Sequence, residues 1–310
     1  MASDRSGCVI AVDVGGTAVK AAVVDRHGTA IARLSVPTSR DGADGVVEQL
    51  GLIADELTHA AHARLMTPVG LGVVVPGRID EAAGVVALAG NLGWRDVPLR
   101  ALAEKRTGLP VTLGHDVRAG GLAEFTLGSS RGAGDHLFLA IGTGVAGAIM
   151  LGGEPYDRGG YAGEIGHVVI EPDGVECGCG GRGCLETMAS AGAIARRYAE
   201  RSGAPVTAAE VAARAAAGEA TAAAVWHEAV DVLVIALAGY AFALAPELIV
   251  IGGGLAGAGE QLLAPLRDRL ADRLGFQRMP TVVGAELGEL AGCLGAGLLA
   301  WRAAGREVRP

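Results

Sequence analysis

Three cysteines and a histidine in the middle of the chain are suited to bind a metal ion. Cys177, Cys179 and Cys184 fall within eight residues of one another. His167 precedes the first of them by ten residues. Three thiolates and one imidazole make a complete tetrahedral ligand set for zinc. Because four protein ligands leave no open position, the pattern predicts a structural Zn²⁺ that pins a glycine-rich loop.

Two other interpretations of these cysteines stay open. In one, the cysteines are buried or reactive thiols in a glycine-rich turn. In the other, two of them form a disulfide and the third stays a free thiol. The chain starts Met-Ala-Ser-Asp-Arg and runs directly into an apolar stretch, so we expect no signal peptide and a cytoplasmic protein. Thiols stay reduced in the cytoplasm, which favours the metal.

A second candidate site is the turn that follows the apolar residues 9–13. Gly15, Gly16 and Thr17 separate this stretch from residues 19–24, which predicts a hairpin. The exposed N–H groups of such a turn can cradle phosphate oxygens, and Asp13 would then face them through a water-bound Mg²⁺. An ordinary Gly-Gly hairpin is the alternative.

Further glycine turns follow in the second half of the chain. Gly142-Thr143-Gly144 separates strand-like residues 136–141 from 145–151 and repeats the first hairpin in kind. Gly252-Gly253-Gly254 lies between a predicted strand and a helix, where a nucleotide base and ribose can approach the backbone closely. The spacing differs from Gly-x-Gly-x-x-Gly, so a Rossmann fold is not favoured.

Strands and helices must position these residues. The order of apolar runs and periodic segments predicts an α/β protein with mixed, mainly parallel sheets. We expect a short strand over residues 111–113, with Asp116 capping the helix that follows, and a loop at residues 90–94. A helix is expected from about Leu185 to Arg201, and the last helix, residues 290–303, should pack back on the first domain. Two similar hairpins indicate duplicated domains that face each other across a cleft.

Composition limits the partners. The net charge is −8 with no basic tract, which argues against nucleic acid. Fifty glycines exceed the usual share of about 7%, and they stand at the ends of apolar runs as in ligand loops. No apolar run reaches the roughly 18 residues of a membrane span without polar interruption, and residues 230–245, the nearest, are a buried-helix candidate.

The motifs resemble those of the ROK family of bacterial sugar kinases and repressors, within the actin–hexokinase superfamily. Asp13 to Thr17 looks like the first phosphate motif of that family, residues 141–144 like the second, and residues 249–254 like its adenosine motif. Gly-Glu-Ile-Gly-His at residues 163–167, with the cysteine cluster, resembles its zinc signature.

The resemblance implies a two-domain actin/hexokinase-like fold (a duplicated ribonuclease H-like fold) with a cleft between the domains. We expect a smaller N-terminal domain of residues 1–117 plus 295–310 and a larger one of residues 118–294 with the zinc loop. The implied reaction is phosphoryl transfer from ATP, bound with Mg²⁺, to the 6-hydroxyl of a hexose.

The resemblance also implies roles for single residues. Asp116 would be the general base that accepts the hydroxyl proton. The expected sugar-binding residues are Gly77, Asn91, His115, Asp116, Glu164, His167 and Glu186. The expected nucleotide-binding residues are Asp13, Gly15, Gly16, Thr17, Lys20, Gly142, Thr143, Gly144, Gly252, Gly253 and Gly254. A plain helix N-cap is the alternative for Asp116, and the second ring nitrogen of His167 is expected to orient or touch the sugar.

One residue departs from the family pattern. His115 stands immediately before Asp116, where the family usually has an Asn that helps to hold a ring hydroxyl. Glucose is the leading substrate, and an amino or N-acetyl hexose (N-acetylmannosamine, N-acetylglucosamine or a 3-amino glucose) is the alternative. ATP and polyphosphate are both open as donors. We expect a homodimer or homotetramer.

Two non-enzymatic classes compete with the kinase. A repressor would need a DNA-binding helix-turn-helix, and Asp13 lies too near the N-terminus to leave room for one. A sugar-responsive regulator that has lost catalysis is disfavoured because Asp13 and Asp116 are both present.

Overall fold

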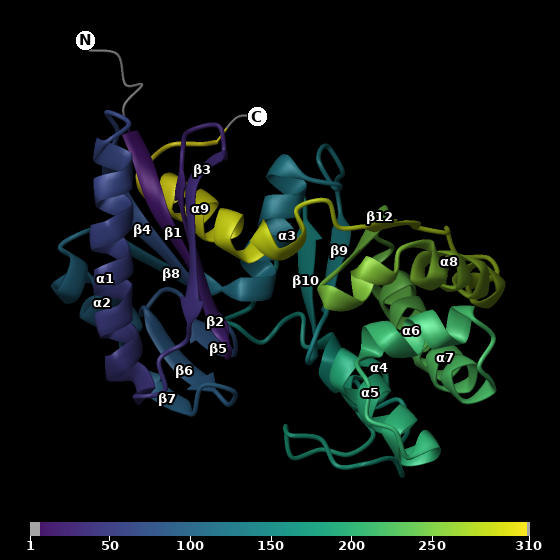
Figure 1. The fold of residues 1–310 in the computed structure, drawn as a ribbon. Helices are drawn as coiled ribbons and strands as arrows, with labels where there is room; N and C mark the ends of the chain where they lie inside the picture. The colour runs from purple at the N-terminus through teal and green to yellow at the C-terminus, as the bar shows by residue number, and fades with distance from the viewer. Residues whose placement is uncertain (1–6, 309–310) are drawn as a thin grey trace. The chain divides into compact units, whose positions relative to one another are not determined.

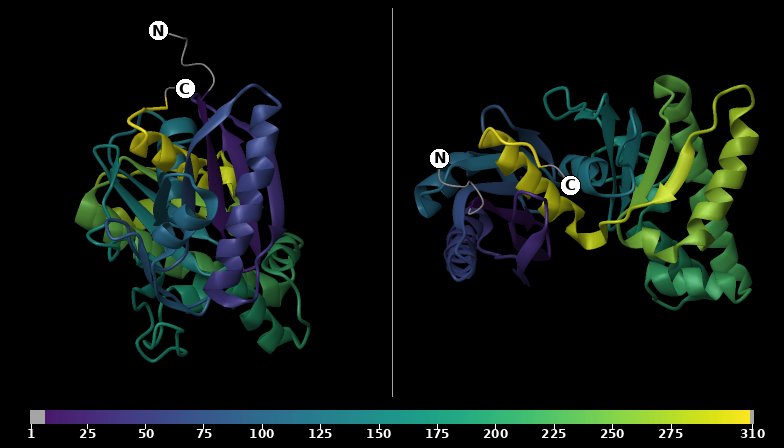
Figure 2. Two further views of the ribbon diagram at one scale, coloured as in Figure 1. Left: turned by 90° about the vertical axis from the view of Figure 1, so that its left-hand side faces the viewer. Right: turned by 90° about the horizontal axis from the view of Figure 1, so that it is seen from above.

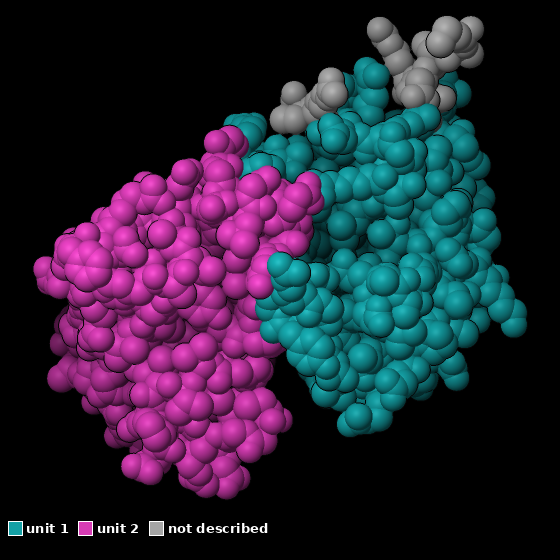
Figure 3. Space-filling view, turned by 180° about the vertical axis from the view of Figure 1, so that it is seen from behind, with its two compact units in different colours: residues 1–131, 157–162, 290–310 teal, residues 132–156, 163–289 magenta. Residues whose placement is uncertain are grey.

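The computed structural model describes residues 7–308 of the chain, which forms two compact units (Figure 3). The first unit consists of Met1–Arg131, Asp157–Ala162 and Leu290–Pro310. The second consists of Gly132–Tyr156 and Gly163–Glu289. Each unit is built on one five-stranded sheet with helices packed against it, so the expected α/β class is confirmed.

The first sheet has the strand order β3-β2-β1-β4-β8. Its strands are β1 (Gly7–Val14), β2 (Ala18–Val24), β3 (Ala30–Pro37), β4 (Thr67–Val75) and β8 (Val111–His115). β2 pairs antiparallel with both β1 and β3, whereas β1, β4 and β8 are parallel to one another. β1 and β4 are almost fully buried, which matches their continuous runs of apolar residues. The expected hairpin of residues 9–24 is confirmed.

Helices cover both faces of this sheet (Figures 1 and 2). α1 (Gly42–His62) packs on one face, and the other carries α9 (Ala291–Ala303) with α3 (Asp116–Leu127) beside it. Glycines let α9 approach closely, because a Cβ on Gly295 would overlap the carbonyl of Ala119 in α3. The last helix of the chain therefore packs on the first unit, as the sequence predicted.

The limits of the units differ from the expected boundary between residues 117 and 118. That boundary would cut α3 after its second residue, whereas α3 lies wholly in the first unit because it packs along α9. The first unit also includes the short segment Asp157–Ala162, where Tyr161 accepts a hydrogen bond from Arg78 at 2.9 Å.

A small antiparallel sheet that the sequence did not predict lies between β4 and α2 (Leu99–Thr107) in the chain. Its strands are β5 (Arg78–Asp80), β6 (Val85–Ala89) and β7 (Trp94–Val97). The expected loop of residues 90–94 is the turn between β6 and β7, extended by the first residue of β7.

The second sheet repeats the first, with the order β11-β10-β9-β12-β13. Its strands are β9 (His136–Ile141), β10 (Val145–Leu151), β11 (Glu154–Pro155), β12 (Leu248–Gly252) and β13 (Thr281–Gly284). The first three again pair antiparallel, and β9, β12 and β13 are again parallel. The sequence prediction of two similar hairpins is thereby confirmed.

The core of the second unit forms between this sheet and a layer of helices (Figure 1). The helices are α4 (Glu186–Ala189), α5 (Ala191–Ser202), α6 (Ala208–Ala216), α7 (Ala220–Leu244) and α8 (Glu260–Leu274). The single helix expected from Leu185 to Arg201 is wrong, because Ser190 ends α4 and its hydroxyl caps α5 through Ala193 N.

Among the described residues, α7 is the one helix whose length and apolar composition would allow it to cross a membrane. Half of its apolar window is buried, and it packs against α5, α6 and α8. Its character is that of a core helix, as expected from the sequence for residues 230–245.

Candidate active site

The candidate residues fall into two groups, one in each unit. The first unit holds Asp13, Gly15, Gly16, Thr17, Lys20, Gly77, Asn91, His115 and Asp116. The second unit holds Gly142, Thr143, Gly144, Glu164, His167, Cys177, Cys179, Cys184, Glu186, Gly252, Gly253 and Gly254.

Parallel strands bring the first group together. β1, β4 and β8 end at the same edge of the first sheet, and their last residues lead into Gly15, Gly77 and Asp116. Gly77 has a φ of 103°, and a Cβ there would overlap the carbonyl of Leu88 in β6. Only glycine fits this junction without strain.

The first turn is held in place by a contact that the sequence did not reveal. Gly15 N donates to Ala18 O at 3.0 Å, and the hydroxyl of Thr38 donates to Gly15 O at 2.6 Å. Gly16 and Thr17 stay exposed. The Asn91 amide nitrogen lies 3.8 Å from where a Cβ on Gly16 would stand, so the β6–β7 turn brings Asn91 to the phosphate-type turn.

Asp13 occupies an unusual electrostatic position at the end of β1. Its pKa is raised from the ordinary 3.8 to about 7, mainly by burial and also by the charge of Asp116, while Lys20, opposite it on β2, acts to lower it. A Cβ on Gly292 in α9 would stand 2.5 Å from Asp13 Oδ2. The carboxylate is therefore confined by α9, and a cation beside it would favour its ionised form.

His115 and Asp116 mark the start of α3. The sequence predicted Asp116 as the N-cap, which is wrong: His115 is the N-cap, because β8 continues to it through pairing with Val75. Asp116 is the first helical residue, and its Oδ1 accepts a hydrogen bond from Val117 N at 2.7 Å. The side chain of Asp116 is 27% exposed, and no hydrogen bond to its Oδ2 is made within residues 7–308. One carboxylate oxygen is thus fixed and the other is available to accept a proton.

In the second unit, two glycine turns lie side by side at one edge of the sheet. β9 and β12 are parallel neighbours, with Ala140 opposite Gly252. A Cβ on Gly253, whose φ is 77°, would overlap the backbone of Ile141, immediately before the turn of residues 142–144. The two predicted nucleotide motifs of this unit are therefore adjacent.

Glycines also position Glu164 and His167. Gly163 O accepts a hydrogen bond from Gly147 N at 2.9 Å, and a Cβ on Gly163 or Gly166 would overlap backbone carbonyls of β10. The short helix η1 (Ile165–His167) consequently lies directly on β10. His167 Nε2 lies 3.9 Å from Glu164 Oε2, so the two side chains face each other from neighbouring turns of the backbone.

Glu186 links the zinc loop to the second turn. Its Oε2 accepts a hydrogen bond from Val145 N at 3.0 Å, and a Cβ on Gly144 would overlap the same oxygen. Ala191 N donates to Gly142 O at 2.8 Å from the other side. The turn of residues 142–144 is therefore held by residues at the starts of α4 and α5.

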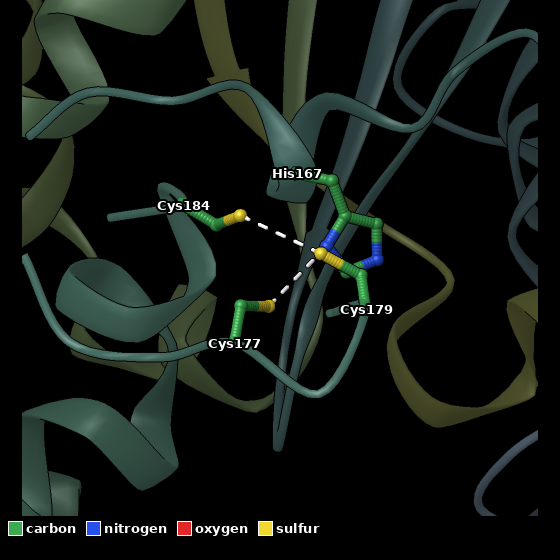
Figure 4. Close-up of side chains that lie close together, drawn as sticks. All are labelled: His167, Cys177, Cys179 and Cys184. Carbon is green, nitrogen blue, oxygen red and sulfur yellow. Dashed lines mark hydrogen bonds between the residues drawn. The ribbon is translucent and has the colours of Figure 1, made fainter. Parts of the chain in front are cut away.

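The four predicted metal ligands converge on one point (Figure 4). His167 Nδ1 lies 3.6 Å from Cys177 Sγ, and the Sγ atoms of Cys179 and Cys184 are 3.7 Å apart. All four ligand atoms lie within 4.8 Å of one another. Tetrahedral zinc, with Zn–S bonds of about 2.3 Å and Zn–N of about 2.0 Å, separates two sulfurs by roughly 3.8 Å and sulfur from nitrogen by roughly 3.6 Å. The residues present therefore fit zinc.

The thiols would have to lose their protons to bind a metal ion. All five cysteines of the chain are free. Burial raises the pKa of Cys184 to about 12 and raises that of Cys177, whereas the N–H of Gly181 lowers that of Cys179. Three thiolates this close together repel one another unless a metal ion neutralises them.

The sequence analysis did not identify three residues that support the first group. Two of them are Gly292, which confines Asp13, and Thr38, which holds the turn at Gly15. The third is Arg118, which is 4% exposed, forms an ion pair with Glu81 at 3.1 Å and lowers the pKa of His115 through its charge. The Gly-rich face of α9 was the one local signal available, since small residues in an apolar helix indicate close approach of a neighbour.

Comparisons with known proteins identify the family of the chain. The family model described as "ROK family" matches residues 9–303. The chain is 35% identical to a glucokinase from Halalkalibacterium halodurans over 94% of both proteins, and 33% identical to a kanosamine kinase from Amycolatopsis mediterranei over 96% of this chain and 98% of that protein. It superimposes with a TM-score of 0.85 on a ROK family glucokinase from Streptomyces griseus in complex with glucose and AMPPNP, at 30% identity, covering 96% of this chain and 100% of that one.

Proposed function

Because the chain belongs to the ROK family, we propose that it is an ATP-dependent hexose kinase that phosphorylates the 6-hydroxyl of glucose. The chain is a sugar kinase by its relatives, and glucose is the sugar named for the glucokinase among them. The observation that carries the proposal is Asp116, whose Oδ1 is fixed by Val117 N while its Oδ2 is available.

In this reaction Asp116 accepts the proton of the attacking hydroxyl through Oδ2. A carboxylate held at a helix start keeps its orientation while a substrate binds, which is what general-base catalysis needs. Asn91, Glu164, His167 and Glu186 bind the other sugar hydroxyls, and Gly77 leaves room beside them. An amide and several carboxylates suit a ligand that presents many hydroxyl donors.

The glycine turns bind the nucleotide. Residues 15–17 and 142–144 offer backbone N–H groups to phosphate oxygens, and the triple glycine at 252–254 admits the nucleoside. Mg²⁺ enters with ATP and neutralises charge on the phosphates. Asp13 would hold this ion through water, and Lys20, opposite Asp13 on β2, contributes positive charge.

Zinc is structural in this proposal. His167 Nδ1 and the three thiolates would hold it, which would fix the ring with Nε2 near Glu164 and anchor the loop that ends at Glu186. Outer partners of this kind orient the residues around a metal. We also propose that the enzyme works in the cytoplasm, where ATP is supplied, and assembles as a homodimer or homotetramer.

The test measures ADP release in a coupled assay. ATP is the donor, and the sugars are glucose, mannose, N-acetylmannosamine, N-acetylglucosamine and a 3-amino glucose. We expect glucose to give the highest kcat/KM and NMR of the product to show phosphate at O6. Polyphosphate in place of ATP tests the donor. Absence of sugar-dependent ADP release from zinc-loaded protein would refute the proposal. The kanosamine kinase relative makes an amino hexose the second candidate.

A further inference from the structure

The ring of His115 is bound to the start of α3 through one nitrogen. Nδ1 lies 3.2 Å from Val117 N and 3.3 Å from Arg118 N, and it accepts from both backbone N–H groups. A ring nitrogen that accepts hydrogen bonds carries no proton, so the hydrogen of the neutral ring is on Nε2. The cap therefore fixes the tautomer of His115.

Three features keep the ring neutral. His115 is 7% exposed, it stands at the positive end of α3, and the Arg118 guanidinium lies nearby. Asp116 Oδ1, 3.4 Å from Nδ1, acts in the opposite direction. Burial has the largest effect, and the pKa of His115 falls to about 4.

Arg118 is held in position by an ion pair with Glu81. Its side chain is 4% exposed, and one terminal nitrogen donates to Glu81 Oε1 at 3.1 Å. Its Nε is buried and makes no hydrogen bond within residues 7–308. The positive charge is thus fixed beside His115 by the turn between β5 and β6.

We infer that His115 determines sugar specificity by offering the substrate one N–H donor, Nε2–H, and no acceptor. The enzyme then selects hexoses that carry an acceptor oxygen at the facing ring position, in a hydroxyl or acetamido group, over those that carry a protonated amine there. This inference rests on the proposed function and on the expected place of His115 among the sugar-binding residues.

The difference from an Asn at this position is one of lone pairs. An Asn side-chain oxygen has two, so it can cap α3 and still accept a hydrogen bond from the sugar. His115 Nδ1 has a single lone pair, which the cap uses. An ammonium group, with three donors and no acceptor, would meet a donor and a fixed guanidinium. Sites with such fixed hydrogen-bonding groups reject mismatched analogues strongly.

The experiment compares wild type with His115→Asn, which retains a good N-cap and adds an acceptor. The substrates are glucose derivatives in which the hydroxyl at C2, C3 or C4 is replaced by amino, fluoro, hydrogen or acetamido. His62→Asn, an exposed position at the end of α1, is the matched control.

At one ring position we expect wild type to lose roughly a hundredfold in kcat/KM for the amino derivative. The fluoro derivative, a weak acceptor without a donor, should lose less than the deoxy derivative. In His115→Asn the amino penalty should shrink by about tenfold, the size of one good hydrogen bond. His62→Asn should behave as wild type.

A second measurement reads the ring directly. Long-range ¹H–¹⁵N spectra of histidine-labelled enzyme, with the His115 signals assigned by their loss in His115→Asn, should show a neutral ring with its hydrogen on Nε2 from pH 6 to 8. A hydrogen on Nδ1, or protonation of the ring within that range, overturns the inference whatever the kinetics.

The kinetic outcomes separate the two proposals. Equal substrate ratios in wild type and His115→Asn, with hexoses phosphorylated by both, overturn the inference and leave the kinase assignment intact. Wild type that turns over no hexose overturns the proposed function, and with it the assignment of His115 to sugar selection.

Discussion

The two sheets of the molecule share one plan and carry different chemistry. Both place an antiparallel hairpin beside two parallel strands, with a glycine turn at the hairpin end. In the first sheet, strand ends supply Asp13 and the His115-Asp116 pair, with Lys20 opposite Asp13. In the second, the corresponding strands β9 and β13 end in Ile141 and Gly284, and the carboxylate at the turn, Glu186, comes from outside the sheet.

The duplicated fold places a glycine turn that could bind phosphate at the same edge of each sheet. The residues near the strand ends then determine which further chemistry each unit can carry. Asp116 and Glu186 each begin a helix and each accept a hydrogen bond from a backbone N–H, so their surroundings make the difference. Asp116 follows His115 at the end of β8, whereas Glu186 follows the loop that holds the predicted zinc ligands. We expect proton transfer to depend on Asp116, and Glu186 to serve sugar binding.

The sharpest test of this division is Asp116→Asn. An amide oxygen can still accept from Val117 N, so we expect the fold to be kept while kcat falls by about 10²–10⁴, the usual contribution of a general base. Steady-state kinetics on the best hexose measures it. Glu186→Gln is the counterpart in the second unit and should raise the KM for sugar more than it lowers kcat. Equal losses of kcat in both variants would break the comparison.

Removal of a zinc ligand should affect the second unit alone. Cys179→Ala should reduce bound zinc from about one ion per chain to almost none. We expect the KM for sugar to rise about 10- to 100-fold, the range for lost support around a metal site. Mass spectrometry of metals and kinetics give both numbers. Cys293→Ala, a buried cysteine outside the cluster, should retain zinc. Active wild type without zinc would contradict the prediction.

Gly292→Ala tests the confinement of Asp13. The new Cβ would stand 2.5 Å from Asp13 Oδ2 and must displace that carboxylate. We expect the KM for Mg·ATP to rise about tenfold, with a smaller change for sugar, because misplaced groups weaken binding steeply. Gly297→Ala on the same helix meets Val24 side-chain atoms at 3.0–3.2 Å and serves as the control. If both variants raise the KM equally, α9 acts through general packing.

The smallest expected effect concerns stability and pH. The pKa of Asp13 is about 7 in the folded protein and near the ordinary 3.8 in the unfolded chain. Well below the lower value, both states hold the proton. As pH rises from 4 to 7, the unfolded chain releases this proton while the folded one retains it, and stability falls. Asp13→Asn should therefore stabilise the nucleotide-free protein by on the order of 1–2 kcal/mol at pH 8 relative to its effect at pH 4.

Urea unfolding of wild type and Asp13→Asn between pH 4 and 8 measures this difference. Asp55→Asn, which changes an exposed carboxylate on α1, controls for loss of one charge. A stability difference that stays constant over the whole range would show that Asp13 is not strained by burial. Added Mg·ATP should reverse the effect for wild type, because a cation favours the ionised carboxylate.

Local patterns in the sequence predicted the hairpins, the glycine turns and the zinc ligands, because each depends on residues close together in the chain. The start of α3 was misassigned because Asp is a preferred N-cap, whereas pairing of β8 with β4 carries the strand on to His115. The break at Ser190 escaped because its cause is tertiary: Ala191 N binds the carbonyl of Gly142, 49 positions earlier.

Contacts distant in sequence explain the remaining differences. β5, β6 and β7 are only three to five residues long and show no alternation strong enough to predict a sheet. The Arg118–Glu81 pair joins residues 37 positions apart, and α9 reaches Asp13 from the far end of the chain. Periodicity and propensity carry no information on which distant elements will meet.

The return of α9 to the first unit has a consequence for biosynthesis. The ribosome makes the strands β1, β4 and β8 first, then the whole second unit, and α9 last. The face of the first sheet that α9 covers stays open to solvent during translation. The second unit can therefore fold before the first unit receives its final helix. A chaperone that shields this face, or a premature stop codon after residue 290, would act on the first unit and spare the second.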